Sequence, residues 1–325
     1  MSENTQHSEL SPKMLEILRK LEEKHDAVGE NLEAHLEGLF YSYFVNYWDY
    51  IGIDALLNLQ KPKTKYSDEM IFIIYHQISE LFFKMILHEI EQIGNATDLT
   101  PDFFLKKINR INAYYDHLLN SFNLLSVGLE SEQFMKFRKT LTPASGFQSI
   151  QYRLIEVWST HFSNLLDAED KANLSPNASV EDVYQHIYWK KGATYKKTQQ
   201  KTLTLLQFEE KYSKLIIRKG KELKDKNILS CYLNLPTEAQ NNPTIIEALR
   251  QFDKHANLNW PMAHYGYAIK HLQKDKEVVP STGGTNWQQY LPPHFNKILF
   301  YPNLWSEKEK KEWGKEWIEK EILSK

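Results

Sequence analysis

The chain has 325 residues, 42% of them hydrophobic and 25% charged, and its 40 basic and 42 acidic residues leave a formal net charge of -2. This composition excludes an intrinsically disordered chain, because it supplies enough apolar surface for a sizeable core. The nearly balanced charge provides no one-signed field that would attract nucleic acid or anionic lipid, so we expect neither nucleic acid nor a membrane as a partner.

The cellular location follows from the cysteine count and the first residues. Cys231 is the single cysteine, so no internal disulfide can form, and the opening MSENTQHSEL has neither the basic nor the apolar region of a secretory signal. Charged residues interrupt every apolar run before it reaches the roughly 18 residues that a membrane span needs. We therefore expect a cytoplasmic protein.

Apolar residues recur at spacings of three and four along most of the chain, and only 12 Gly and 12 Pro interrupt this helical period. We predict an all-α fold in a single domain over 1–325, with an N-terminal helical extension over 1–45 and a polar excursion over about 167–201. The predicted helices span 12–39, 49–59, 68–94, 102–125, 147–166, 180–189, 195–224, 245–273 and 307–323.

The segment 67–91, SDEMIFIIYHQISELFFKMILHEIE, predicts an interior helix that begins at a capping Ser67. Its centre is apolar nearly all round, and Phe72, His76 and Phe83 share one face at spacings of four and seven. A histidine in such surroundings is more often a satisfied core residue than a functional one. Both interpretations of His76 remain open from this segment alone.

The segment 134–153, FMKFRKTLTPASGFQSIQYR, places Arg138 and Arg153 among aromatic residues on either side of a Pro-Ala-Ser-Gly turn. A guanidinium in this setting needs a carboxylate or another planar acceptor. A structural ion pair is the commoner solution. The alternative is a small polar ligand, for which Ser145 and Gly146 would offer a hydroxyl and backbone amides.

The segment 260–284, WPMAHYGYAIKHLQKDKEVVPSTGG, carries His264 on a predicted helix. The small residues Ala263 and Gly266 leave room for a flat macrocycle beside the imidazole, and haem iron needs a single axial histidine. An ordinary core or surface histidine is several times commoner than a haem ligand. Pro261 removes a helix hydrogen bond, so the helix is expected to kink or to begin there.

Other metal chemistries find no support in the sequence. A carboxylate-bridged di-iron bundle needs two Glu-x-x-His pairs, and the chain has one, Glu22-x-x-His25, on a polar helix. A single cysteine excludes cysteine-based zinc and iron–sulfur sites, and no Gly-rich phosphate loop is present. Haem is the metal group that the sequence leaves open, beside no metal at all.

These three segments, in this order, resemble the tryptophan 2,3-dioxygenase family. The resemblance rests on FIIYHQISELFFKMILHEI, on FRKTLTPASGFQSIQYRLIE, and on the spacing from Trp260 to His264 followed by Thr282-Gly283-Gly284. The run Tyr47-x-x-Tyr50-x-x-x-Asp54 matches the family's opening motif. The similarity extends from Tyr47 to about Leu291.

The resemblance implies a homotetrameric helical bundle that uses ferrous haem b and O2 to convert L-tryptophan to N-formylkynurenine, the first step of the kynurenine pathway. It implies that His264 is the proximal iron ligand and that His76, on the distal side, accepts the indole N–H. It further implies that Arg138 binds the substrate carboxylate, and that Thr282 contacts the ammonium and carboxylate groups. The remaining implied contacts are indole packing by Phe72 and Phe134, haem contacts by Ser145 and Trp260, and completion of a neighbouring subunit's pocket by Tyr47 and Tyr50.

The chain also departs from the family pattern. Thr285-Asn286-Trp287 replaces the small residues of the family's Gly-Thr-Gly-Gly-Ser-Ser-Gly loop, and the link from His264 to this loop is longer. Two alternatives therefore stay beside the leading hypothesis. One is a haem oxygenase of the same fold that acts on a modified tryptophan or inserts one oxygen atom, and the other is a non-catalytic haem-binding bundle. Product mass distinguishes the first alternative, and lack of turnover with haem bound distinguishes the second.

Overall fold

The computed structural model describes residues 10–42, 46–175, 177–195, 198–274, 277–278 and 297–315. The chain divides into two compact units, Met1–Leu59 and Gln60–Lys325. The described part is all-α, as predicted, apart from one short hairpin in which strand β1 (Gln273–Lys274) pairs antiparallel with β2 (Glu277–Val278). The boundary after Leu59 lies beyond the predicted extension of residues 1–45.

The first unit consists of helices α1 (Pro12–Asp26), α2 (Leu32–Phe40), α3 (Tyr47–Ile51) and α4 (Ile53–Leu57). The predicted single helix over 12–39 is wrong, because Gly29 takes a left-handed conformation at φ 74° and Asn31 then caps α2 by accepting from Ala34 N at 2.9 Å. The predicted helix over 49–59 is divided in the same way by Gly52 at φ 61°. None of the residues of these helices is buried.

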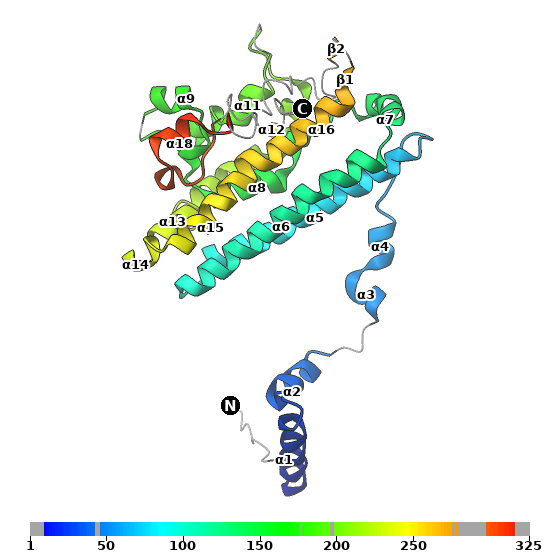
Figure 1. The fold of residues 1–325 in the computed structure, drawn as a ribbon, viewed down its shortest axis with the longest axis vertical. Coiled ribbons are helices and arrows are strands. Elements are labelled where there is room, and N and C mark those ends of the chain that lie inside the picture. Colours follow the sequence, from blue (N-terminus) through cyan, green and yellow to red (C-terminus); the bar gives the residue numbers. More distant parts are fainter. Residues whose placement is uncertain are drawn as a thin grey trace, which may run out of the picture. The chain divides into compact units, whose positions relative to one another are not determined.

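The second unit is built on a pair of long helices, α5 (Asp68–Gly94) and α6 (Pro101–Gly128), which lie side by side (Figure 1). Only residues 95–100 connect them, so they run antiparallel. Thr100 caps α6 by accepting from Phe103 N at 3.3 Å, and Pro101 occupies the first turn, where its missing N–H costs nothing.

The start of α5 differs from the prediction. The Ser67 side chain makes no cap hydrogen bond to its own helix and donates to Gln133 Oε1 at 3.0 Å. The Glu69 carboxylate instead accepts from the backbone N–H groups of Lys63 and Thr64, at 2.8 and 2.7 Å. A buried acidic side chain in the first turn therefore holds the preceding loop against the helix end, where negative charge is favoured.

Other helices cover this pair. α8 (Ile150–Ser159) and α13 (Ile228–Leu233) pack on α5, and α15 (Pro243–Lys254) and α16 (Trp260–Leu272) pack on α6. The core between them contains fully buried Ile86, Ile90, Ile108 and Ile111. The remaining elements are α7 (Ser131–Phe137), η1 (Arg138–Leu141), η2 (Gly146–Gln148), η3 (Phe162–Leu165), α9 (Ala168–Asn173), α10 (Val180–Gln185), α11 (Tyr188–Gly192), α12 (Leu203–Glu222), α14 (Thr237–Gln240), η5 (Pro302–Leu304) and α18 (Glu307–Lys311).

The long helix predicted over 245–273 exists, but its winding changes in the middle. Between α15 and α16 lies a π-helical turn, η4 (His255–Asn259). Pro261 therefore does not start a new helix, because the widened turn before it absorbs the irregularity. The predicted helix over 195–224 begins only at Leu203 in α12. The predicted helix over 307–323 is described as far as α18, and its last residues lie outside the described part.

The polar excursion of residues 167–201 is packed against the rest of the unit. Lys190 pairs with Glu209 of α12 at 2.8 Å, and Lys191 pairs with Asp167 at 2.5 Å. Tyr184 and Trp189 are buried within the main core. The excursion is thus part of the folded unit and contributes aromatic side chains to its core.

One helix among the described residues, α5, is long and apolar enough to cross a membrane, by length and composition alone. In the structure it carries Glu89, whose buried carboxylate pairs with Lys107 at 2.8 Å and with Arg110 at 2.7 Å. Only 28% of its most apolar 18-residue window is buried. Much of its apolar surface is therefore uncovered in a single chain.

Candidate functional site

His76 lies on α5, and a neighbouring backbone carbonyl selects the tautomer of its neutral ring. Its Nδ1 lies 2.7 Å from the carbonyl oxygen of Phe72, one turn earlier. A carbonyl oxygen can only accept, so Nδ1 carries the proton and Nε2 of the neutral ring is left as an acceptor. The Phe72 ring lies against the imidazole, with 4.1 Å between ring centroids. His76 is thus prepared to accept an N–H hydrogen bond beside an aromatic wall.

His264 lies on α16 among aromatic side chains. The ring of Phe122, from α6, is nearly parallel to its imidazole, with centroids 6.4 Å apart and 24° between planes. Phe122 also contacts Trp260 at 4.9 Å, and Trp260 packs edge to face on Phe83 at 5.5 Å. Trp260, one turn before His264, therefore ties the start of α16 to both α5 and α6.

The two imidazoles form a pair of neutral bases. Burial lowers the pKa of His264 to about 4, and the charge of nearby His76 acts in the same direction. Burial also lowers the pKa of His76. Both residues keep solvent-exposed surface. The surrounding protein nevertheless lowers the pKa of each imidazole. Both imidazoles are therefore neutral at physiological pH, and the effect of His76 on His264 indicates that the two side chains lie near each other.

An aromatic wall extends from Phe72 to α7. The Phe72 ring lies 5.9 Å from Phe134 and 5.6 Å from Phe137, and both of these are buried. Arg138 follows Phe137 directly in the chain, and its side chain is buried. Burial lowers the pKa of Arg138, yet arginine remains a cation at physiological pH. A buried cation thus directly follows, in the chain, the helix whose Phe134 and Phe137 pack on Phe72.

The residues around His264 fit a flat macrocycle. A Cβ placed on Gly146 would lie 4.0 Å from His264 Cε1, and one placed on Gly266 would meet nothing within 4 Å. A side chain at position 146 would therefore occupy the space next to the imidazole, which glycine leaves open. No group of three or more His, Cys, Asp or Glu residues in the described part is arranged to hold a metal ion. A metal carried by a haem needs only one protein ligand, which His264 can provide as a neutral imidazole.

The loop before η2 is held close to this site. Ser145, which precedes Gly146, is half-buried, and its backbone N–H donates to Gln148 Oε1 at 3.2 Å. Gln148 Nε2 in turn donates to the carbonyl of Thr204 at 3.1 Å. The Pro-Ala-Ser-Gly turn therefore has a fixed position, with Gly146 next to His264.

The other predicted site residues lie elsewhere or outside the described part. Thr282 belongs to residues 279–296, which the structure does not describe. Tyr47 and Tyr50 lie in the first unit and are 70% and 80% exposed. Their predicted contribution to a neighbouring subunit's pocket stays a prediction.

The two arginines of the Pro-Ala-Ser-Gly segment have different environments. Arg153 is buried in an ion pair with Glu156 at 3.1 Å and donates to Tyr188 Oη at 3.2 Å. The structural interpretation, an ion pair, therefore holds for Arg153. The acidic residue Glu156, three positions later, indicated this pair in the sequence. Phe122 and Phe137 were not among the predicted site residues. Only the packing of α6 and α7 brings their rings to the candidate site.

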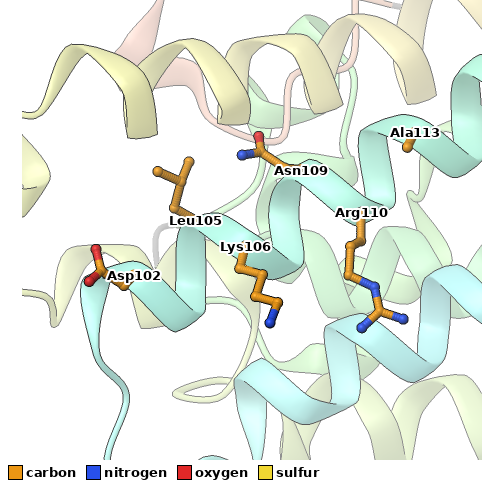
Figure 2. A pocket seen from close by; sticks show the side chains of 6 residues that line it. All are labelled: Asp102, Leu105, Lys106, Asn109, Arg110 and Ala113. Carbon is orange, nitrogen blue, oxygen red and sulfur yellow. The ribbon is translucent and has the colours of Figure 1, made fainter. Parts of the chain in front are cut away.

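A separate hollow lies along the first half of α6. It measures about 490 Å³ and is lined by one face of that helix, from Asp102 to Ala113 (Figure 2). Arg110, which borders it, already pairs with buried Glu89. The hollow contains neither of the paired histidines and no aromatic wall, so it is not the candidate site.

Comparison with known proteins identifies the class to which this fold and site belong. The family model of tryptophan 2,3-dioxygenase matches residues 37–220. The chain is 28% identical to the tryptophan 2,3-dioxygenase of Burkholderia multivorans, covering 85% of this chain and 87% of that protein. It is 26% identical to the enzyme of the same name from Pseudomonas fluorescens, covering 84% and 94% of the two chains. The chain belongs to the tryptophan 2,3-dioxygenase family and is an oxidoreductase.

Proposed function

We propose that the protein is a cytoplasmic haem b enzyme that uses O2 to cleave the C2–C3 bond of the indole of L-tryptophan, giving N-formylkynurenine. The observation that carries this proposal is that two solvent-accessible imidazoles from different helices, His76 and His264, lie near each other and are neutral at physiological pH. The family membership and the names of the relatives support the same reaction. The matched residues 37–220 include His76 and Arg138 but not His264.

Some residues of the chain would bind the cofactor, and others would bind the substrate. His264 would hold the haem from the proximal side, with Gly146 and Ser145 beside it. Haem, when bound, supplies the iron chemistry that lets triplet O2 react with a closed-shell indole. The protein's part is to hold the C2–C3 bond of the indole at the place where O2 is activated.

Substrate binding would use the distal wall. His76 Nε2 would accept the indole N–H, and the rings of Phe72 and Phe134 would pack on the indole faces. Arg138 would bind the α-carboxylate through a bidentate hydrogen-bonded pair, with Thr282 completing the contacts to the amino acid. An apolar recess with few polar groups of this kind orients a small flat ligand and excludes water.

The absorption spectrum of the purified protein, before and after reduction with dithionite, tests this proposal. A haem protein with a histidine ligand gives a Soret band that shifts on reduction, and L-tryptophan should perturb that band because it binds next to the haem. A protein that takes up no haem when reconstituted would contradict the proposal. A haem band that L-tryptophan leaves unchanged would contradict the substrate.

We further propose a homotetramer in which each pocket is completed by Tyr47 and Tyr50 of a neighbouring chain. Support comes from the uncovered apolar surface of both units. Besides these tyrosines, the first unit exposes large hydrophobic side chains along all four helices. In the second unit, a stripe on α5 is exposed at spacings of four and seven, and consists of Met70, Ile74, Leu81 and Met85.

Charge placed on this stripe should dissociate the oligomer. Burial of one such side chain contributes about 1.5–3 kcal/mol, and a lysine there would forfeit that contribution. We expect light scattering to give a tetramer mass for the wild type and a smaller mass for Ile74→Lys/Leu81→Lys. Leu206→Lys, which changes an exposed leucine on α12, should keep the wild-type mass. An active wild-type monomer would show that the proposal is wrong.

A further inference from the structure

The helix that carries His264 changes its winding just before that residue. In the π-turn η4 the N–H of Trp260 donates to the carbonyl of His255, five residues earlier. A π-turn takes up one residue more than an α-turn, so it rotates everything after it by about 100° around the helix axis. The direction in which His264 points therefore depends on this turn being in place.

Pro261 leaves one carbonyl of the turn without a helical donor. In the α pattern the carbonyl of Ala256 would accept from Trp260, whose N–H is already used by His255. In the π pattern it would accept from residue 261, and proline has no N–H. Ala256 is only 1% exposed, so water does not substitute freely. A buried carbonyl in this position requires a partner from elsewhere in the fold.

Tyr152 provides that partner from α8. Its hydroxyl donates to the Ala256 carbonyl oxygen at 2.5 Å, across 104 residues of sequence. The tyrosine ring is buried and packs edge to face on Phe83 at 5.3 Å, which fixes its direction. Burial raises the pKa of Tyr152 well above its ordinary value, so the hydroxyl keeps its proton. The bond is thus available over the whole physiological pH range.

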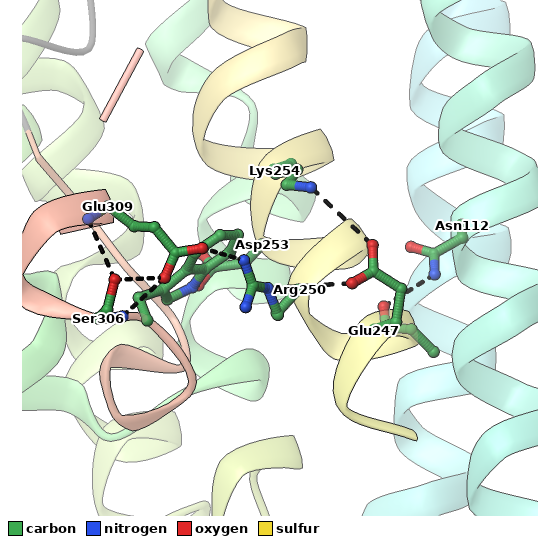
Figure 3. A network of polar contacts seen from close by, with 9 residues as sticks. Asn112, Glu247, Arg250, Asp253, Lys254, Ser306 and Glu309 are labelled. Atoms are coloured by element: carbon green, nitrogen blue, oxygen red, sulfur yellow. Dashed lines mark hydrogen bonds and ion pairs between the residues drawn. The ribbon is translucent and has the colours of Figure 1, made fainter. Parts of the chain in front are cut away.

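The helix before the turn is held independently. Asp253 accepts from Phe300 N and from Trp305 Nε1, both at 2.9 Å, and from Asn257 Nδ2 at 2.8 Å. Arg250 pairs with Glu309 of the same returning segment (Figure 3). Because α15 is anchored in this way, a change in η4 cannot be absorbed upstream and passes to α16.

We propose that Tyr152 is a positioning residue for His264: its hydroxyl replaces the donor that Pro261 lacks, holds the π-turn at Ala256, and so sets the rotation of α16 that turns the imidazole toward the haem site. This inference rests on the proposed role of His264 as haem ligand. It adds a function for a residue that acts through its hydrogen bond to the backbone of the turn.

The test compares Tyr152→Phe with Tyr115→Phe in the full-length chain. Both variants remove one hydroxyl from a buried ring, but Tyr115 Oη has no hydrogen-bond partner among the described residues. In the haem-free protein, amide hydrogen exchange of Trp260 and of residues 262–264 should rise about tenfold in Tyr152→Phe, the usual consequence of leaving a buried acceptor unpaired. In the reconstituted protein, transfer of haem to apomyoglobin should be about tenfold faster. Tyr115→Phe should match the wild type in both measurements.

A second substitution separates positioning from general loosening of the core. Pro261→Ala restores an N–H that can satisfy the turn, so it should return Tyr152→Phe to near wild-type exchange and haem retention. Wild-type exchange in Tyr152→Phe, or no recovery in the double variant, would overturn the inference. If the wild type binds no haem, the proposed function fails, and the exchange measurements still decide whether Tyr152 holds the turn.

Discussion

Replacement of His264 by alanine should remove most of the bound haem. The imidazole would hold the haem iron under the proposed function, and its pKa of about 4 keeps it neutral and able to bind a metal. No cluster of metal-ligating side chains in the described residues is arranged to replace it. We expect the haem content of reconstituted His264→Ala, measured by pyridine haemochrome, to be a small fraction of the wild-type value.

Two controls make this result specific. His117→Ala removes an exposed imidazole from α6 and should keep full haem content. Addition of free imidazole to His264→Ala should restore a Soret band, because the small ligand can enter the space left by the side chain. A His264→Ala protein with wild-type haem content and an unshifted Soret band would show that another residue binds the iron.

Replacement of Arg138 by leucine should cost about 2 to 5 kcal/mol of transition-state stabilisation on L-tryptophan, or at least about 30-fold in kcat/KM. The guanidinium is buried, so a carboxylate bound to it would be shielded from water. Haem content should stay unchanged, since the proposed contact of Arg138 is with the substrate and not with the haem.

A substrate without the carboxylate isolates this contact. The wild type should discriminate strongly against 3-methylindole relative to L-tryptophan, and Arg138→Leu should lose most of that discrimination. Arg138→Lys should recover part of it, because lysine keeps the charge without the bidentate geometry. Equal kinetics of wild type and Arg138→Leu on L-tryptophan would refute the assignment.

The helices were predicted correctly where the apolar periodicity is continuous. The prediction failed where the conformation of a single backbone residue decides whether a helix continues. Helix α5 begins and ends at the predicted residues, because its pattern is unbroken from Asp68 to Gly94. The breaks at Gly29 and Gly52 were missed, because an isolated glycine is compatible with a helix until its φ is known. Pro261 indicated an irregular helix at this position. The π-turn that forms there depends on Tyr152, which comes from another helix.

The polar residues of the candidate site could be named from the sequence. The aromatic side chains around them could be named only in part. The three segments alone left a structural role open for His76, Arg138 and His264, and the family resemblance singled these residues out. Phe122 could not, since its contact with His264 arises from the crossing of α6 and α16 and has no local signature. Arg153 resembled Arg138 in its aromatic surroundings, and only its pairing with Glu156 separates the two.

The central claim is that the protein inserts both atoms of O2 into L-tryptophan, and the mass of the product tests it most directly. Reduced, haem-loaded protein is incubated with L-tryptophan and 18O2, with the His264→Ala variant as the control. The account predicts N-formylkynurenine that carries two labelled oxygen atoms, and no product from the variant. A product with one labelled atom would identify a monooxygenase of the same fold, and no oxygenated product despite bound haem would contradict the proposed reaction.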